Sequence, residues 1–382
     1  MAVVTRYFST ASAGTGDGSS WANRAALFSG GAWSTVITGF NFSTGSDSLY
    51  CLIEGAKTYT ITALLQATTF TSGAPTIGRP LIFHGCDSSG NPLAAPDGNW
   101  TSDQPIYDTS TFPTLSATTN LTLIDINYNT THLRYFKISS TGSTTNPVIR
   151  NCSFYYCYVT CSASNTSLVV ANTTASAENS VFEATGTSYS AICSAEAISN
   201  CRIVGNSSAT SGNRNGLLIS TANVRVVRVT SINNVGSGIL LNTSTSSSSI
   251  YVYNCMVHGN GYGIRFPSTV TQSGMQRVLG CYIAGSTTAG IDGQSQSYIT
   301  MFGNRLRDNG TSGNFLSQAG NSLTNESDNI NYTTDSDDAS ELVNVAGGDY
   351  RIKNTATIWG MGFGVSEQPA ASTAGGSFVF IG

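Results

Sequence analysis

The sequence predicts an all-β protein, folded as one single-stranded, right-handed parallel β-helix in which each coil stacks on the one before. Three observations support this prediction. Two short phrases recur at one period, small hydroxyl side chains are abundant, and charged residues make up only 10% of the 382 residues. Because 40% of residues are hydrophobic and 10% are aromatic, the chain has enough apolar material for a packed core, and disorder is not predicted.

The first phrase reads Asn, a small residue, a variable residue, and then an aliphatic or aromatic residue. Strand side chains alternate between two faces, so the second and fourth positions are expected to point inward. The second position predicts an inward structural ladder of Cys152, Ser180, Cys201, Val229, Cys255 and Cys281, with a fainter copy at Asn304. Their spacing of 21 to 28 residues suits one coil. The free thiols are then small hydrophobic groups.

A second phrase recurs together with the first, at the same period. It reads Gly216-Leu217-Leu218, Gly238-Ile239-Leu240, Gly263-Ile264-Arg265 and Gly290-Ile291-Asp292. The Asn that opens the first phrase is expected at a turn, because Asn tolerates left-handed backbone conformations. Two phrases in one order at one period predict stacked coils.

Segments outside the clearest coils have their own predicted roles. We expect a capping helix at residues 20–28, with Ser19 or Ser20 as its N-cap, covering the open first coil. The predicted organisation is a β-helix over 1–365, containing an N-terminal cap at 1–48, a loop insertion at 87–119, the clearest coils at 148–310 and a C-terminal cap at 341–365, followed by a tail at 366–382.

Composition limits the possible partners. The net charge is −4 without a basic block, which disfavours nucleic acid as a partner. No apolar run has the roughly 18 residues of a membrane helix, and residues 1–6 lack a secretory signal. Synthesis and retention in a cytoplasm are therefore expected. Nine Cys, an odd number, fit neither a disulfide framework nor a zinc knuckle. We predict no cofactor and no metal.

Three segments resemble the pectin-lyase-like right-handed parallel β-helix proteins, especially those of bacteriophages. They are the opening Arg6-Tyr7-Phe8-Ser9-Thr10 with Gly16-Asp17-Gly18-Ser19-Ser20-Trp21-Ala22-Asn23, the coils described above, and the close Gly348-Asp349-Tyr350-Arg351-Ile352-Lys353 with Ile358-Trp359-Gly360-Met361-Gly362. The resemblance implies the fold. It does not indicate one function, because proteins of this architecture include lyases, hydrolases, tailspikes and structural proteins.

Catalysis is not predicted. Glycoside hydrolysis requires two carboxyl groups about 5–9.5 Å apart, and the acids between residues 150 and 310 do not fall at equivalent positions of neighbouring coils. They are Glu178, Glu183, Glu196, Asp292 and Asp308. The repeat register does pair Arg265 with Asp292, which we interpret as an exposed salt bridge of under about 1 kcal/mol.

Three further groups of residues resemble catalytic or metal sites. Arg351-Ile352-Lys353 matches a polygalacturonase tripeptide, but its place in the closing segment indicates part of the end cap. The acids Asp335, Asp337 and Asp338 lack the Gly and distal Glu of a calcium loop, so a solvated turn is predicted. The three histidines, His84, His132 and His258, are scattered, with no nucleophile tied to them.

The favoured hypothesis is a bacteriophage virion structural protein, specifically a capsid decoration or cement protein assembled in the host cytoplasm. The β-helix is expected to fill almost the whole chain, leaving no room for the extra domains of a tailspike. By analogy with related phage proteins we expect a homotrimer that contacts major capsid subunits. Phe378, Val379, Phe380 and Ile381, together with the 87–119 loop, are the candidate contact surfaces.

Two alternatives remain. One is a phage tailspike or receptor-binding protein that binds or depolymerises host polysaccharide. Its groove would be lined by Tyr251, Tyr253, Tyr262 and Tyr282. The other is a bacterial surface adhesin, which the missing secretion signal disfavours.

Overall fold

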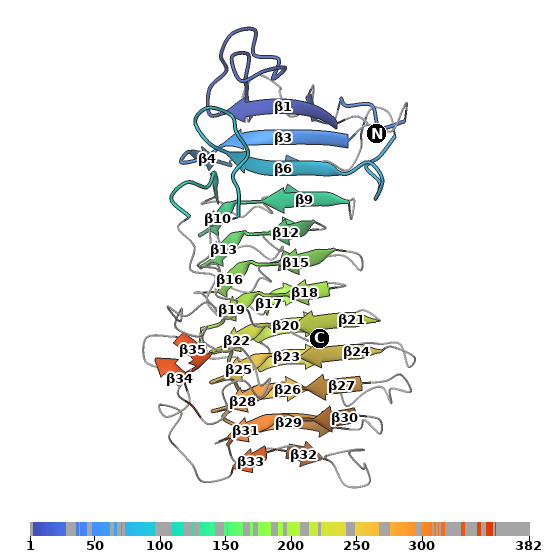
Figure 1. Cartoon of the computed structure of the whole chain (residues 1–382), viewed down its shortest axis with the longest axis vertical. Helices are drawn as coiled ribbons and strands as arrows, with labels where there is room; N and C mark the ends of the chain where they lie inside the picture. Colours follow the sequence, from blue (N-terminus) through green and yellow to red (C-terminus); the bar gives the residue numbers. More distant parts are fainter. Residues whose placement is uncertain are drawn as a thin grey trace, which may run out of the picture.

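The computed structural model is a right-handed parallel β-helix in which three sheets run the length of a tall prism (Figure 1). It describes residues 3–27, 36–37, 39–43, 48–61, 65–66, 70, 73–95, 109–117, 124–125, 130–141, 149–150, 152–162, 169–170, 175–184, 190–193, 197–206, 214–220, 223–241, 249–266, 276–294, 299–307, 309–310, 312, 315–317, 330–332, 342–344, 349–353 and 356. The predicted fold class is confirmed.

Successive coils place one strand in each sheet, and the strands within the three sheets pair in parallel. The 12-stranded sheet contains β1 (Val3–Ser9), β2 (Ala25–Ala26), β3 (Ser48–Glu54), β6 (Leu81–Cys86), β9 (Thr131–Arg134), β12 (Ser153–Tyr155), β15 (Ser176–Glu178), β18 (Ala197–Ser199), β21 (Val224–Val227), β24 (Ile250–Tyr253), β27 (Gln276–Leu279) and β30 (Ile299–Phe302). The 11-stranded sheet contains β4 (Thr58–Thr60), β7 (Thr114–Ala117), β10 (Lys137–Ser140), β13 (Tyr158–Cys161), β16 (Val181–Ala184), β19 (Arg202–Val204), β22 (Thr230–Ile232), β25 (Met256–His258), β28 (Tyr282–Ala284), β31 (Arg305–Arg307) and β33 (Ile330–Tyr332). The 10-stranded sheet contains β5 (Leu65–Gln66), β8 (Ile124–Asp125), β11 (Ile149–Arg150), β14 (Val169–Val170), β17 (Ser190–Cys193), β20 (Asn215–Ile219), β23 (Ser237–Leu241), β26 (Tyr262–Arg265), β29 (Ala289–Gln294) and β32 (Phe315–Ser317).

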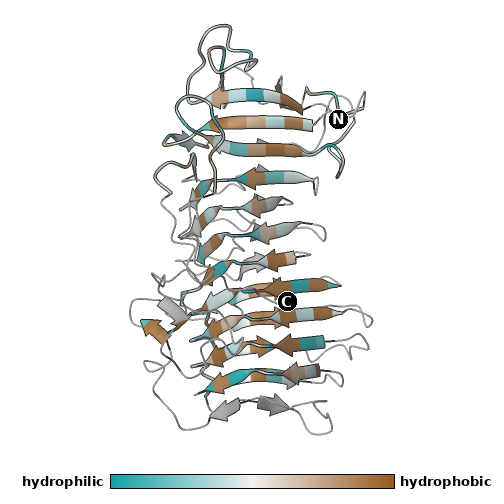
Figure 2. Cartoon of the chain, viewed as in Figure 1, coloured by the Kyte–Doolittle hydropathy of each residue, from teal (hydrophilic) through white to brown (hydrophobic). Residues whose placement is uncertain are grey.

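The core is a continuous apolar column inside the prism, and Figure 2 shows apolar residues recurring along the stacked strands. In the 11-stranded sheet the inward position is Ile138, Val159, Phe182 and Ile203 on four successive strands, each fully buried. The inner residues of the second phrase, Leu217, Ile239, Ile264 and Ile291, stack in the same way in the 10-stranded sheet. Dispersion and burial along these rows hold the coils together.

From β9 to β31, the corner between the 12-stranded and 11-stranded sheets has one left-handed residue in each coil. That residue is Tyr135, Tyr156, Asn179, Asn200, Arg228, Asn254, Gly280 and Gly303 in turn, each with φ between 49° and 62°. Most L-residues disfavour this conformation, whereas Asn and Gly tolerate it. The Asn of the first phrase therefore lies at this corner.

The inward ladder is formed by the residue that follows the corner in each coil. Ser180, Cys201, Val229, Cys255 and Cys281 occupy it and are fully buried, and Cys157 precedes Ser180, whose Oγ accepts the Cys157 N–H at 3.0 Å. The predicted place of Cys152 in this ladder is wrong. Cys152 is buried but leads into β12 of the 12-stranded sheet, because the left-handed corner residue of its coil is Tyr156.

A second corner, between the 11-stranded and 10-stranded sheets, is closed by buried side-chain amides. The Asn260 Oδ1 accepts the backbone N–H and a side-chain N–H of Asn234, at 2.9 and 2.8 Å, and its Nδ2 donates to Ser231 O at 3.0 Å. These bonds satisfy polar groups that would otherwise be costly to bury.

The predicted capping helix at 20–28 is absent from its described residues. Ala25 and Ala26 instead form β2, which pairs in parallel with Phe8 and Ser9 of β1. Ser20 does accept the Asn23 N–H, but in a turn. Pairing with the edge of β1 satisfies backbone groups that a helix would leave exposed. Across the described part of the chain, no helix has the length and hydropathy to cross a membrane.

The C-terminal segment also departs from the prediction of an end cap at 341–365. Strands β34 (Leu342–Asn344) and β35 (Asp349–Ile352) form an antiparallel hairpin that lies beside the prism (Figure 1). Leu342 and Ile352 pack on Ile232, Met256, Tyr282 and Ala284, which point outward from the 11-stranded sheet. The hairpin covers a side of the solenoid because those outward positions are apolar.

The predicted 87–119 insertion contains a strand of the solenoid. Thr114–Ala117 form β7, which pairs with β4 and β10. Any excursion from the coils in this segment therefore ends before Thr114.

Candidate functional site

The outer face of the 11-stranded sheet is mostly polar and partly exposed from β4 to β19. Its apolar outward residues are Val181, which is buried between Tyr158 and Arg202 in the register, and Val204, which packs against residues beneath the C-terminal hairpin. Its outward positions alternate with the buried inner row and include Thr58, Thr60, Thr114, Ser116, Lys137, Ser139, Tyr158, Thr160, Glu183 and Arg202. Adjacent strands lie about 4.8 Å apart. Side chains on neighbouring strands are therefore close enough to contact the same ligand.

Three side chains on β13, β16 and β19 form what we call the polar row: Tyr158, Glu183 and Arg202. The Tyr158 hydroxyl donates to Glu183 Oε2 at 2.5 Å. Burial and the neighbouring Glu183 carboxylate raise the pKa of Tyr158, and the Arg202 charge partly opposes this. The phenol therefore stays protonated at neutral pH. The row presents an aromatic ring, a carboxylate and a guanidinium.

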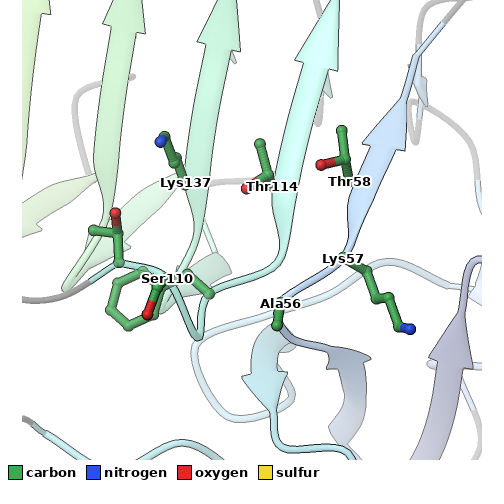
Figure 3. Close-up of a pocket in the computed structure, with 8 residues that line it drawn as sticks. Ala56, Lys57, Thr58, Ser110, Thr114 and Lys137 are labelled. Atoms are coloured by element: carbon green, nitrogen blue, oxygen red, sulfur yellow. The ribbon is translucent and has the colours of Figure 1, made fainter.

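A pocket of about 370 Å³ opens beside the polar row, at the first positions of β4, β7 and β10 (Figure 3). It is lined by Ala56, Lys57, Thr58, Thr109, Ser110, Phe112, Thr114 and Lys137. Thr58, Thr114 and Lys137 are register partners on adjacent strands, and Figure 3 shows them side by side. We call this the lysine pocket. Its size falls in the range of small-ligand sites.

An aromatic stack supports the pocket from the neighbouring corner. The corner residues Tyr135 and Tyr156 stack with ring centroids 5.1 Å apart, and Tyr135 also contacts Phe112 of the pocket wall at 5.7 Å. His84 stacks on Tyr135 at 4.8 Å. Ring contacts of this kind fix the position of Phe112.

His84 is held neutral within this stack. Its Nε2 lies 2.8 Å from Leu93 O and its Nδ1 lies 2.7 Å from the Tyr50 hydroxyl. A neutral ring that donates from Nε2 and accepts at Nδ1 satisfies both bonds. Burial lowers the pKa of His84 to about 4. Burial also lowers the pKa of His132 to about 4, with a smaller contribution from Arg134.

The sequence-predicted acids are distributed over three sheets. Glu178 lies on β15 of the 12-stranded sheet, Glu183 on β16 of the 11-stranded sheet and Asp292 on β29 of the 10-stranded sheet. Glu196 and Asp308 lie outside the described residues. Among the described residues, no group of three His, Cys, Asp or Glu side chains is placed to hold a metal ion.

The predicted exposed salt bridge between Arg265 and Asp292 forms, with Arg265 partly exposed but with its carboxylate partner buried. Arg265 Nε lies 3.1 Å from Asp292 Oδ2, and the Asp292 side chain has no exposed area. Gln294 donates to both carboxylate oxygens of Asp292, and Arg265 also lies over the Tyr262 ring at 4.3 Å. A fully satisfied buried carboxylate indicates a structural role.

The tyrosine groove of the alternative hypothesis does not form. Tyr251 and Tyr253 lie on the 12-stranded sheet and Tyr262 lies on the 10-stranded sheet. Tyr282, on the 11-stranded sheet, is fully buried beneath the hairpin. These four residues are close in sequence but are divided among three sheets, because the chain turns corners of the coil between them.

Among the described residues, the remaining candidate groups from the sequence form no reactive site. Burial raises the pKa of the Cys157 and Cys201 thiols to about 12, which removes the reactive thiolate. Residues 351–353 lie at the end of the hairpin. The Asp335, Asp337 and Asp338 turn and the apolar segment Phe378, Val379, Phe380 and Ile381 lie outside the described residues.

Sequence reasoning missed Tyr158, Lys137 and the lysine pocket. Tyr156-Cys157-Tyr158-Val159 fits the first phrase once Tyr is allowed at the corner. In that register Tyr158 and Arg202 fall at the same variable, outward position. The signal was present but hidden by a corner residue that is not Asn.

No protein-family model matches the chain, and no curated protein matches it. Among solved structures, the chain is similar to the catalytic domain of a GH87 α-1,3-glucanase, a point variant in complex with nigerose. The two share 12% sequence identity with a TM-score of 0.34, over 74% of this chain and 64% of that chain. This chain thus spans under two thirds of the length of that domain.

The prediction that the chain is not an enzyme is wrong on this comparison, because the matching structure is the catalytic domain of a glycoside hydrolase. The capsid role, the homotrimer and the location in a virion stay predictions, as does the likeness to phage proteins.

Proposed function

We propose that the chain binds a bacterial surface polysaccharide along the open outer face of the 11-stranded sheet, as the receptor-binding protein of a bacteriophage. The proposal rests on the polar row. Tyr158, Glu183 and Arg202 lie on three adjacent strands and are partly exposed on one flat face. The assignment to a phage particle rests on the resemblance of the opening and closing motifs.

The chemistry of the row suits a sugar polymer. The tyrosine ring offers an apolar surface for a sugar ring, while its hydroxyl keeps a polar partner in Glu183. A carboxylate accepts hydrogen bonds from sugar hydroxyls and a guanidinium donates them, and bonds to charged groups are the stronger ones. A long polymer lying along the prism meets several strands of this face at once.

The capsid role, which the sequence favoured, stays a prediction that the described contacts do not test. Its contact candidates were Phe378, Val379, Phe380, Ile381 and the 87–119 loop. The first four lie outside the described residues, and the described part of the loop contributes Thr109, Ser110, Phe112 and Thr114 to the lysine pocket. We favour glycan binding because the polar row supports it.

The test is binding of purified capsular and O-antigen polysaccharides, measured by biolayer interferometry. We expect at least one polysaccharide to bind, and Tyr158→Ala or Arg202→Gln to weaken it at least about tenfold, which is about 1.4 kcal/mol. Tyr158→Phe, which keeps the ring, is expected to lose less. Reducing-end release in the same samples distinguishes binding from depolymerisation.

A matched control is Arg225→Gln, on the exposed face of β21 in the 12-stranded sheet. It removes one positive charge far from the polar row and is expected to leave binding unchanged. Equal affinities of wild-type protein, Tyr158→Ala and Arg202→Gln would contradict the proposal.

A further inference from the structure

The lysine pocket concentrates a residue type that the chain otherwise hardly uses. The sequence contains three lysines, Lys57, Lys137 and Lys353, and two of them line this one pocket. The Lys57 side chain points away from Lys137 (Figure 3). Lys137 is therefore the cation that an anionic ligand in the hollow would meet.

The two ammonium groups are not equally compensated. Lys57 Nζ lies 3.8 Å from Glu54 Oε1, and the other oxygen of that buried carboxylate accepts the Ser9 hydroxyl. Among the described residues, no carboxylate oxygen lies within 4 Å of Lys137 Nζ. Among the described residues that line the pocket, Lys137 is therefore the cation without a neighbouring carboxylate.

Hydroxyl-bearing residues line the same pocket as Lys137. Thr58 and Thr114 point outward beside Lys137 from adjacent strands, and Ser110 stands on the opposite wall (Figure 3). An ammonium with several hydroxyl donors suits an oxyanion, because each oxygen accepts more than one hydrogen bond. A neutral sugar has no negative charge to compensate the ammonium group of Lys137.

The wall of the pocket is built in advance by close backbone packing. Phe112 N donates to Thr109 O at 3.1 Å, closing a turn, and Ala56 N donates to Thr111 O at 3.1 Å. A Cβ at Gly55 would lie 2.0 Å from Thr111 O, so only glycine allows this approach. The pocket needs no rearrangement to accept a small ligand.

We propose that the lysine pocket binds an oxyanion carried by a sugar, either the carboxylate of a uronic acid or a sugar phosphate. The pocket lies next to the polar row, since Lys137 and Tyr158 are register partners on β10 and β13. This inference rests on the proposed function and adds the ligand class: an acidic polysaccharide whose charged group enters at Lys137.

The experiment titrates D-glucuronate, glucose 6-phosphate and D-glucose separately into the full chain, with affinity measured by ligand-observed NMR at 50 mM NaCl. We expect one or both anions to bind at least tenfold more tightly than glucose. The ratio between the two anions distinguishes a carboxylate from a phosphate site. Raising NaCl to 500 mM is expected to weaken the anions and not glucose.

Matched variants locate the binding. Lys137→Gln is expected to lose at least tenfold in anion affinity, and Lys57→Gln is expected to lose less, because Glu54 already compensates Lys57. Arg225→Gln is expected to bind as wild type does. Circular dichroism melting of each variant shows whether it is folded. Anion affinity that equals that of glucose, or that is unchanged in Lys137→Gln, would overturn the inference.

The two proposals fail separately. Polysaccharide binding that depends on Tyr158 while both anions bind no better than glucose would retain the proposed function and overturn the anion site. Anion binding that depends on Lys137, with no polysaccharide retained, would support the anion site and overturn the proposed function.

Discussion

The outer face of the 11-stranded sheet is exposed over one stretch of the solenoid and covered by the C-terminal hairpin over the next. Over β4 to β19 its outward residues are mostly hydroxyl-bearing or charged and remain partly exposed. Over β22 to β28, Ile232, Met256, Tyr282 and Ala284 are buried beneath Leu342 and Ile352 of the hairpin.

The two halves share their backbone, and only the outward positions differ. The strands keep one parallel register from β4 to β33, and the inner position stays buried from Leu115 to Leu306. A solenoid can therefore use one stretch of a sheet for ligands and the next stretch as an internal interface. Which use applies depends on every second residue of each strand.

The largest expected effect tests this contrast with one substitution in each half. Ile232 and Ser116 occupy the same outward column of the sheet, connected through successive strand pairs. Ile232→Asp buries a charge under the hairpin and is expected to lower the free energy of unfolding by at least about 3 kcal/mol. Ser116→Asp, on the open face, is expected to change it by less than about 0.5 kcal/mol. Urea unfolding followed by circular dichroism measures both, and equal effects would remove the distinction between the halves.

A smaller effect is expected from pH, and it concerns coils of the open half. The pKa of His84 and of His132 is about 4 in the folded chain, below the ordinary 6.5. A lowered pKa means that the neutral ring is favoured by folding. The stability is therefore complete above pH 6.5 and is lost as the pH falls toward 4. Each ring is expected to contribute about 1–3 kcal/mol.

Thermal melting between pH 7.5 and 4.5 measures this loss. The double variant His84→Gln, His132→Gln is expected to start from a lower melting temperature and to lose less of it as the pH falls. Parallel curves for the variant and the wild type would assign the acid sensitivity to other groups.

The smallest effect is expected where the two halves are alike. Asn200 and Asn254 occupy the same left-handed corner, with φ of 51° in each. Replacing either by Ala is expected to cost about 1 kcal/mol, because Ala has the same Cβ penalty as Asn but lacks the short polar side chain that makes this conformation tolerable for Asn. Asn→Gly at the same sites is expected to be near neutral. Markedly different costs at the two sites, measured by urea unfolding, would show that the corners are not equivalent.

The sequence alone determined the fold class and much of the register. The two phrases mark a corner and an inner row, because a corner requires a residue that tolerates positive φ and an inner row requires apolar side chains. Those are local requirements, and local residues reveal them. The same reasoning failed at Cys152, where Tyr156 takes the corner in place of an Asn and shifts the phrase by five residues.

Only the tertiary structure decided what lies beyond the individual coil. The hairpin at 342–352 covers outward residues some 60 to 120 positions earlier in the chain, and the lysine pocket joins Lys57 to Lys137 across 80 residues. Such contacts depend on how many coils separate two segments and on which side chains point outward. Neither is visible until all the coils are placed in register, because loops of variable length separate the strands.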